Sequence, residues 1–111
     1  MKSYNKVTLI GRVGQDLEVK EIENGLVVNF SIATTEKVSK DKEITDWHSI
    51  VAWNGLATIA GKLLQKGSLV LVEGSLRNDN YEKNETKSYN YKVVADKLVV
   101  LADGKEKEEN S

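Results

Sequence analysis

Two tryptophans near the middle of the chain are the residues whose type and spacing best suit ligand chemistry. Trp47 and Trp53 stand six residues apart in a run of β-forming residues that ends at Asn54-Gly55. Because side chains alternate between the two faces of a strand, both indoles are expected on one face, about 20 Å apart. This arrangement suits two separate platforms on which flat aromatic groups stack. Tryptophan is also a large apolar residue, and the spacing alone leaves open that this face packs in the core.

Catalytic and metal-binding chemistry find little support in the sequence. His48 is the only histidine and the chain has no cysteine, so a metal site would need carboxylates beside the imidazole. Only Asp46 is expected on the same strand face, which is a weak ligand pattern. No pattern marks a nucleophile beside a base, and the glycines of Gly11-Arg12-Val13-Gly14 are too closely spaced for a phosphate-binding loop. We therefore expect no enzyme activity, no metal and no cofactor.

Length and composition indicate a single globular domain. The chain has 111 residues, of which 40% are hydrophobic and 30% are charged. No apolar run approaches the roughly 20 residues of a membrane helix, and the first residues lack the apolar segment of a secretory signal. We expect a cytoplasmic protein. The net charge of −1 becomes about +1 when the −2 of residues 102–111 is set aside, so any basic surface must be local.

The elements that would position the tryptophans are mainly strands. Alternation of apolar and polar residues, bounded by turn signals such as Asn24-Gly25, predicts each strand. Residues 36–43 are predicted to form a mobile charged loop, and residues 78–87 a polar loop. The predicted strands cover residues 4–13, 17–22, 28–35, 45–53, 68–77, 88–94 and 98–101, with an interruption at 95–97 and a bulge or corner at Glu73-Gly74.

One helix of about ten residues is predicted after the tryptophan strand. Asn54 is a possible cap, and an apolar stripe with helical spacing follows, formed by Leu56, Ile59, Ala60 and Leu63. A helix after the third of five barrel strands is the element order of the OB-fold. The predicted fold is therefore all-β, a five-stranded Greek-key OB-fold barrel with a helix between strands 3 and 4. The domain is predicted to cover residues 1–101, and residues 102–111 a short disordered acidic tail.

A series of short motifs runs through residues 4 to about 101. They are Asn5–Arg12 with Gln15-Asp16, Asn24-Gly25, Asn29–Thr34, Trp47-His48 ahead of Val51–Trp53, Leu64–Ser68 and Val72–Arg77. In this order they resemble the bacterial single-stranded DNA-binding protein (SSB) family. The resemblance implies an OB-fold protomer that coats single-stranded DNA with little sequence preference in replication, recombination and repair. It also implies a homotetramer, with a dimer as the other possibility.

The resemblance also implies roles for individual residues. Two groups are expected to bind single-stranded DNA, one by stacking on bases and one by contacting phosphates. His48 matches a position near the family's subunit contacts, so we expect it at an oligomer interface. The stacking group is Trp47, Trp53 and Tyr81, and the phosphate group is Lys2, Lys6, Lys66 and Arg77.

Some departures from the family pattern keep alternatives open. Val38 stands where many members have an aromatic residue, and Asp79-Asn80 stand where basic residues are common. Residues 102–111 lack the apolar-ended acidic tip through which the family recruits replication and repair proteins, so such partners are left open. The main alternative is a primosome-type OB-fold adaptor with secondary DNA binding. A second alternative, an oligosaccharide binder or enzyme fragment, would need a carboxylate-bearing groove, which the tryptophan face does not offer.

Overall fold

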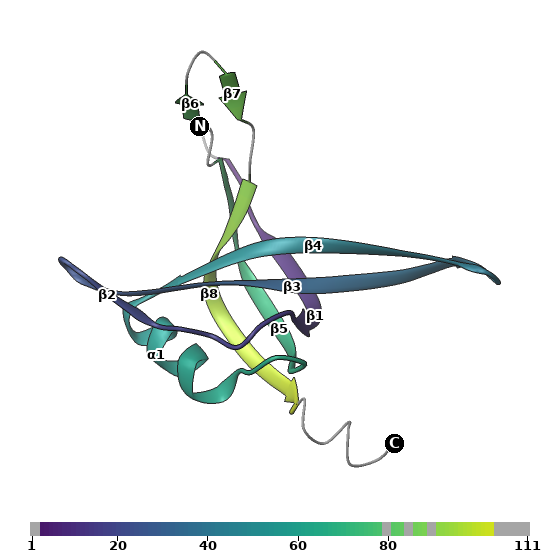
Figure 1. Ribbon diagram of the computed structural model, residues 1–111, viewed down its shortest axis with the longest axis horizontal. Helices are drawn as coiled ribbons and strands as arrows, with labels where there is room; N and C mark the ends of the chain where they lie inside the picture. Colours follow the sequence, from purple (N-terminus) through teal and green to yellow (C-terminus); the bar gives the residue numbers. More distant parts are fainter. Residues whose placement is uncertain (1–2, 79–80, 84–85, 89–90, 104–111) are drawn as a thin grey trace.

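The computed structural model describes residues 3–78, 81–83, 86–88 and 91–103, with segments 81–83 and 86–88 described by their backbone alone. The elements follow one another as drawn in Figure 1. They are β1 (Val7–Val13), β2 (Lys20–Ile22), β3 (Gly25–Ser39), β4 (Lys42–Trp53), α1 (Asn54–Leu63), β5 (Leu69–Asn78), β6 (Tyr81–Lys83), β7 (Thr86–Ser88) and β8 (Tyr91–Ala102).

Five strands close into a barrel in the order β1-β5-β8-β4-β3. The ring closes at the end of β1, where Arg12 pairs with Leu69 of β5 on one side and with Ala33 of β3 on the other. Gly11 permits this close approach, because a Cβ atom there would lie 2.5 Å from the carbonyl oxygen of Ala33. With α1 after the third ring strand, the architecture is the OB-fold, and the predicted fold class is confirmed.

The core contains one face of each barrel strand. Val28, Phe30 and Ile32 of β3 are buried, as their alternation predicted, and they pack with Ile50 and Ala52 of β4. In β4 the core therefore takes the face opposite the tryptophans. Strand β5 adds Val70 and Val72, while β8 adds Val93 and Ala95.

The predicted irregularity near Gly74 is confirmed as a β-bulge. Glu73 pairs with Lys97 and Gly74 with Ala95, so Asp96 is an extra residue in β8. A Cβ atom on Gly74 would lie 2.0 Å from the carbonyl oxygen of Val94, so the backbones meet where only glycine fits. Strand β8 therefore bends at residues 95–97 instead of stopping there. It continues through Ala102, and residues 104–111 lie outside the described residues.

Helix α1 has the predicted length, and part of its predicted apolar stripe faces the barrel. Its buried residues are Ala57 and Ala60, and Leu64 follows them just beyond its end. Of the predicted stripe, Ala60 is buried and Leu56 packs against the core, whereas Ile59 and Leu63 are exposed. Asn54 does not cap the helix. It adopts a positive φ of 53°, which asparagine tolerates, and its Oδ1 accepts a hydrogen bond from the Leu26 N–H.

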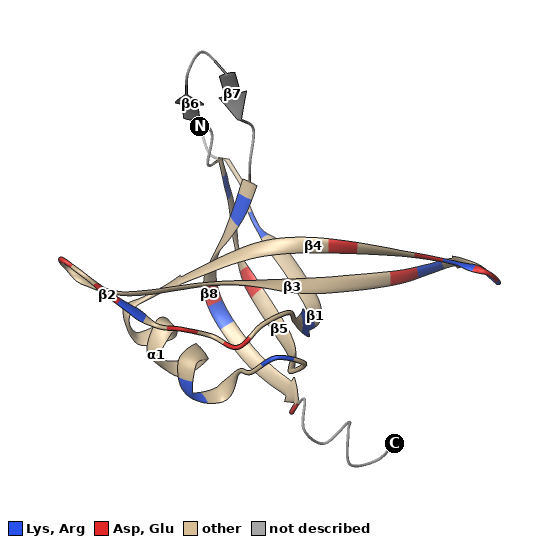
Figure 2. Cartoon of the chain, viewed as in Figure 1, with Lys and Arg blue, Asp and Glu red and all other residues tan. Residues whose placement is uncertain are grey.

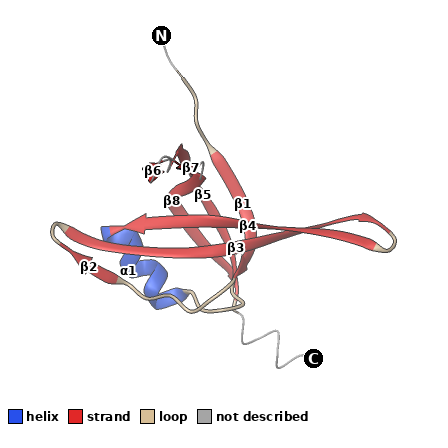
Figure 3. Ribbon diagram, turned by 45° about the horizontal axis from the view of Figure 1, so that its top comes forward, coloured by secondary structure: helices blue, strands red, loops and turns tan. Residues whose placement is uncertain are grey.

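A two-stranded arm replaces the predicted loop at residues 36–43. Strands β3 and β4 stay paired well past the barrel, with Lys37 opposite Glu43 and Ser39 opposite Lys42. Figures 1 and 3 show the arm extending from the barrel as one long ribbon. Because both of its faces meet water, it lacks the apolar alternation by which a strand is predicted. The predicted loop at 78–87 likewise contains a small hairpin, β6 paired with β7.

Candidate nucleic-acid interface

The two tryptophans lie on the outer face of the β3–β4 pair. Trp47 is 62% exposed and Trp53 is 43% exposed. Trp53 lies opposite Val27 and Trp47 opposite Ala33, and the cross-strand pairs between them include Ser31 with Ser49. The structure thus excludes a core role for the indoles and gives two exposed aromatic platforms with a partly polar floor between them.

The stretch between β1 and β2 forms a wall beside Trp47. The N–H of Gly14 donates to the carbonyl oxygen of Ser31 at 3.0 Å. A Cβ atom on Gly14 would lie 2.5 Å from Cζ3 of Trp47, so glycine lets the indole rest directly against this backbone. Gln15 Oε1 accepts from the N–H of Ser31 at 3.3 Å and from its hydroxyl at 2.8 Å. Because the backbone N–H can only donate, the Gln15 amide orientation is fixed and its NH2 group is available to a ligand.

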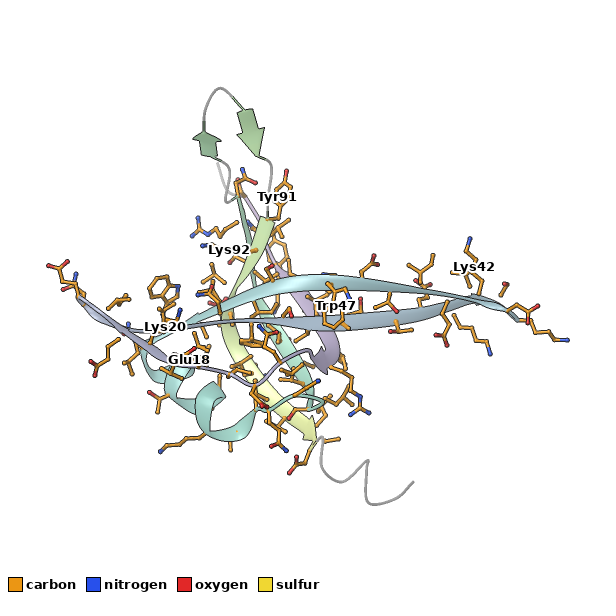
Figure 4. All side chains as sticks on the ribbon, viewed as in Figure 1. Glu18, Lys20, Lys42, Trp47, Tyr91 and Lys92 are labelled. Carbon is orange, nitrogen blue, oxygen red and sulfur yellow. The ribbon has the colours of Figure 1, made fainter. Side chains whose placement is uncertain are left out.

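A hollow of about 390 Å³ opens in this face. It brings together residues that are distant in the sequence, because β8 lies parallel to β4 with Ile50 beside Val93 and Val51 beside Val94. Tyr91, which is 56% exposed, adds an exposed aromatic residue to the lining of this hollow. Figure 4 shows Tyr91 and Lys92 at one end of β8, across the sheet from Glu18 and Lys20. The lining residues are Gln15, Asn29, Phe30, Ser31, Ser49, Ile50, Tyr91 and Lys92.

Sequence reasoning missed Gln15, Tyr91 and Lys92 as candidate site residues. Lys92 and Tyr91 reach the site only through the parallel pairing of β8 with β4, which no local pattern predicts. The one available signal was the aromatic Tyr91 within the predicted strand 88–94. Gln15 belonged to a family-like motif. Its hydrogen bond with Ser31, however, depends on how the stretch between β1 and β2 lies against β3.

The predicted basic residues are divided between different parts of the barrel. Arg77 pairs with Lys92 in the β5–β8 ladder and so lies next to the hollow. The Lys6 ammonium lies 3.5 Å from a carboxylate oxygen of Glu73, on the outer side of β5. Lys66 lies in the turn before β5, where its N–H donates to Asp16 at 3.0 Å. Neither Lys6 nor Lys66 lines the hollow, and phosphate contact by them stays a prediction.

The remaining predicted residues lie apart from the tryptophan face or outside the described atoms. His48 projects from the opposite face of β4, where it is half-buried and its Nε2 lies 2.9 Å from the Thr34 hydroxyl. An oligomer contact at His48 stays a prediction. Lys2 and the side chain of Tyr81 lie outside the described residues.

The charges around the hollow differ between its two sides. A smaller hollow of about 160 Å³ adjoins the first through Gln15 and Asn29, and it is lined by Asp16, Glu18 and Lys20. Figure 2 shows acidic segments along the stretch joining β1 and β2, whereas basic colour marks the start of β8. Among the residues that the structure describes, no group of three or more His, Asp or Glu side chains could hold a metal ion. Within that same part of the chain, no helix has the length and apolarity needed to cross a membrane.

Comparisons with known proteins agree with this geometry. The model of the Single-strand binding protein family matches residues 4–101. The "Single-stranded DNA-binding protein" of Neisseria meningitidis serogroup A is 42% identical over 105 residues, which cover 89% of this chain and 60% of that relative. "Single-stranded DNA-binding protein 1" of Xylella fastidiosa is 39% identical over 118 residues, covering 99% of this chain and 85% of the relative.

A solved structure has the same architecture. It is the Plasmodium falciparum SSB complex with ssDNA, which matches with a TM-score of 0.82 and 33% identity, over 91% of this chain and 97% of the other. This chain spans less than two thirds of the length of the Neisseria relative. The family match covers nearly all of the described residues, and relatives of about 40% identity support it. The chain therefore belongs to the single-strand binding protein family.

Proposed function

We propose that this protein binds and protects single-stranded DNA, with little sequence preference, in replication, recombination and repair. The observation that carries the proposal is the pair of exposed indoles, Trp47 and Trp53, on one outer face of the barrel. Every base has a π face, so such platforms bind bases of any kind, each worth about 1–3 kcal/mol. Lysine and arginine beside them hold phosphates and make the affinity depend on salt. The names of the relatives and of the structural neighbour support this function.

Tryptophan fluorescence during titration with a poly-dT oligonucleotide tests the proposal. We expect strong quenching, since bases would stack on Trp47 or Trp53, and we expect tighter binding at low than at high salt. The same titration with a double-stranded oligonucleotide serves as the control and should give much weaker quenching. A folded protein that shows neither quenching nor binding would contradict the proposal.

The alternative is a primosome-type adaptor that contacts DNA only secondarily. The near-neutral net charge and the carboxylates of Asp16 and Glu18 beside the hollow favour it, because both weaken attraction to phosphate. The exposed indoles favour DNA binding. Neither proposal includes catalysis or a cofactor. We also propose that the protein is located in the cytoplasm.

We infer that the protomers form a homotetramer, or at least a dimer, through the outer face of β1, β5 and β8. Ile10 pairs with Leu71, and Leu71 with Val99, so three apolar side chains form a row across this face. Ile10 is 51% exposed and Val99 is 38% exposed, which suits a surface that a second copy covers. The homotetramer that the family resemblance implies supports the inference.

A charged residue in this row should disrupt the assembly. We expect Val99→Asp to lower the molar mass measured by light scattering after size exclusion, because burying an unpaired carboxylate is costly. Ile59→Asp is the matched control, since Ile59 is similarly exposed but lies on α1. Equal molar masses for the wild-type protein and the Val99→Asp variant would contradict the inferred interface.

A further inference from the structure

A row of polar and basic side chains crosses the barrel between the two tryptophans. Ser31 pairs with Ser49 across β3 and β4. The parallel pairing of Ile50 with Val93 places Lys92 beside Ser49, and both residues line the 390 Å³ hollow. Lys92 in turn pairs with Arg77 of β5. The row therefore runs from β3 to β5, perpendicular to the strands.

The two ends of this row carry opposite charge. Lys92 and Arg77 occupy the end on β8 and β5. At the other end Gln15 accepts a hydrogen bond from the Ser31 hydroxyl. Next to Gln15, the carboxylates of Asp16 and Glu18 line the adjoining hollow. A phosphate is attracted to the first end and repelled from the second, whereas neutral amide and hydroxyl groups at the second end can hydrogen-bond to a base edge.

We propose that Lys92, together with Arg77, binds the sugar–phosphate backbone, and that the bases turn from there toward Ser49, Ser31 and Gln15. The proposal rests on the proposed function and adds to it a binding residue and the side of the site on which the phosphates lie. Trp47 lies two residues from Ser49 along β4 and Trp53 lies four residues away on the other side, so bases that reach Ser49 have an indole on each side.

The test compares three variants that each remove one positive charge. Binding of a dT oligonucleotide is measured over a range of salt concentrations, and thermal unfolding confirms that each variant is folded. For single strands, each phosphate contact contributes about 0.7 to the slope of log affinity against log salt. We expect Lys92→Gln to reduce the magnitude of the slope by about 0.7 and to weaken binding up to about fivefold at low salt.

The other two variants serve as controls. Lys20→Gln removes a charge at the acidic end of the row, and Lys62→Gln removes one on α1, away from both hollows. We expect neither to change the slope. A slope change for Lys20→Gln as large as that for Lys92→Gln, or no slope change for Lys92→Gln, would overturn the inference. A wild-type protein that does not bind the oligonucleotide would instead contradict the proposed function itself.

Discussion

Replacing Trp47 by alanine is expected to weaken binding of single-stranded DNA by about 1–3 kcal/mol, roughly fivefold to 150-fold, with little change in the free energy of unfolding. The indole is 62% exposed and lies against Gly14 outside the core, so its loss opens no cavity among the buried residues. Fluorescence anisotropy of a labelled dT oligonucleotide measures the affinity, and urea unfolding measures the stability.

Trp53→Ala tests whether the second platform acts independently. We expect a loss of affinity of similar size, and because the indoles are about 20 Å apart their effects should add in the double variant. Trp53 lies opposite the buried Val27, so this variant should also lose some stability. Phenylalanine at either position is the matched control, since it keeps a stacking ring. A large loss of stability for both alanine variants, with affinity unchanged in the folded protein, would contradict the platform assignment.

Alternation along the strands predicted the barrel strands and a shared face for the two tryptophans, but it left open whether that face packs in the core. Val28, Phe30 and Ile32 of β3 follow this alternation, and Ile50 and Ala52 place the core opposite the indoles. The same reasoning was right only in part for α1. Of the predicted stripe, Ala60 is buried and Leu56 packs against the core, whereas Ile59 and Leu63 are exposed. The buried side also includes Ala57, which the stripe left out.

The composition of the site could be predicted only in part, because its residues meet through long-range strand pairing. Trp47, Ser49 and Trp53 share a face by local alternation alone. Tyr91 and Lys92 join them because β8 lies parallel to β4, a pairing between residues more than 40 positions apart. Arg77 was predicted from the family resemblance, yet its place beside Lys92 depends on the bulge that sets the register of β5 and β8.

The outer face of strand β4 carries the tryptophans expected to bind DNA, whereas Ile50 on its inner face contributes to stability. Ile50→Ala tests this division of roles. Ile50 is also among the residues that line the 390 Å³ hollow, but it is only 1% exposed and packs in the core. We expect its truncation to lower the free energy of unfolding by about 2–5 kcal/mol, because it removes buried methyl groups and leaves a cavity. Urea unfolding gives this value. The affinity of the folded fraction for dT, measured without denaturant, should change much less than in Trp47→Ala.

Ile44→Ala is the matched control for this prediction, because it makes the same substitution on the same strand in the arm. Ile44 is 42% exposed there, so its truncation should change stability by no more than about 0.5 kcal/mol. Equal stability losses at Ile44 and Ile50 would contradict the assignment of the core face. If Ile50→Ala kept wild-type stability but lost DNA binding, the inner face of β4 would be part of the binding surface. The opposite pattern, stability lost at Ile50 and affinity lost at Trp47, is expected because alternate residues of one strand face the core and the solvent.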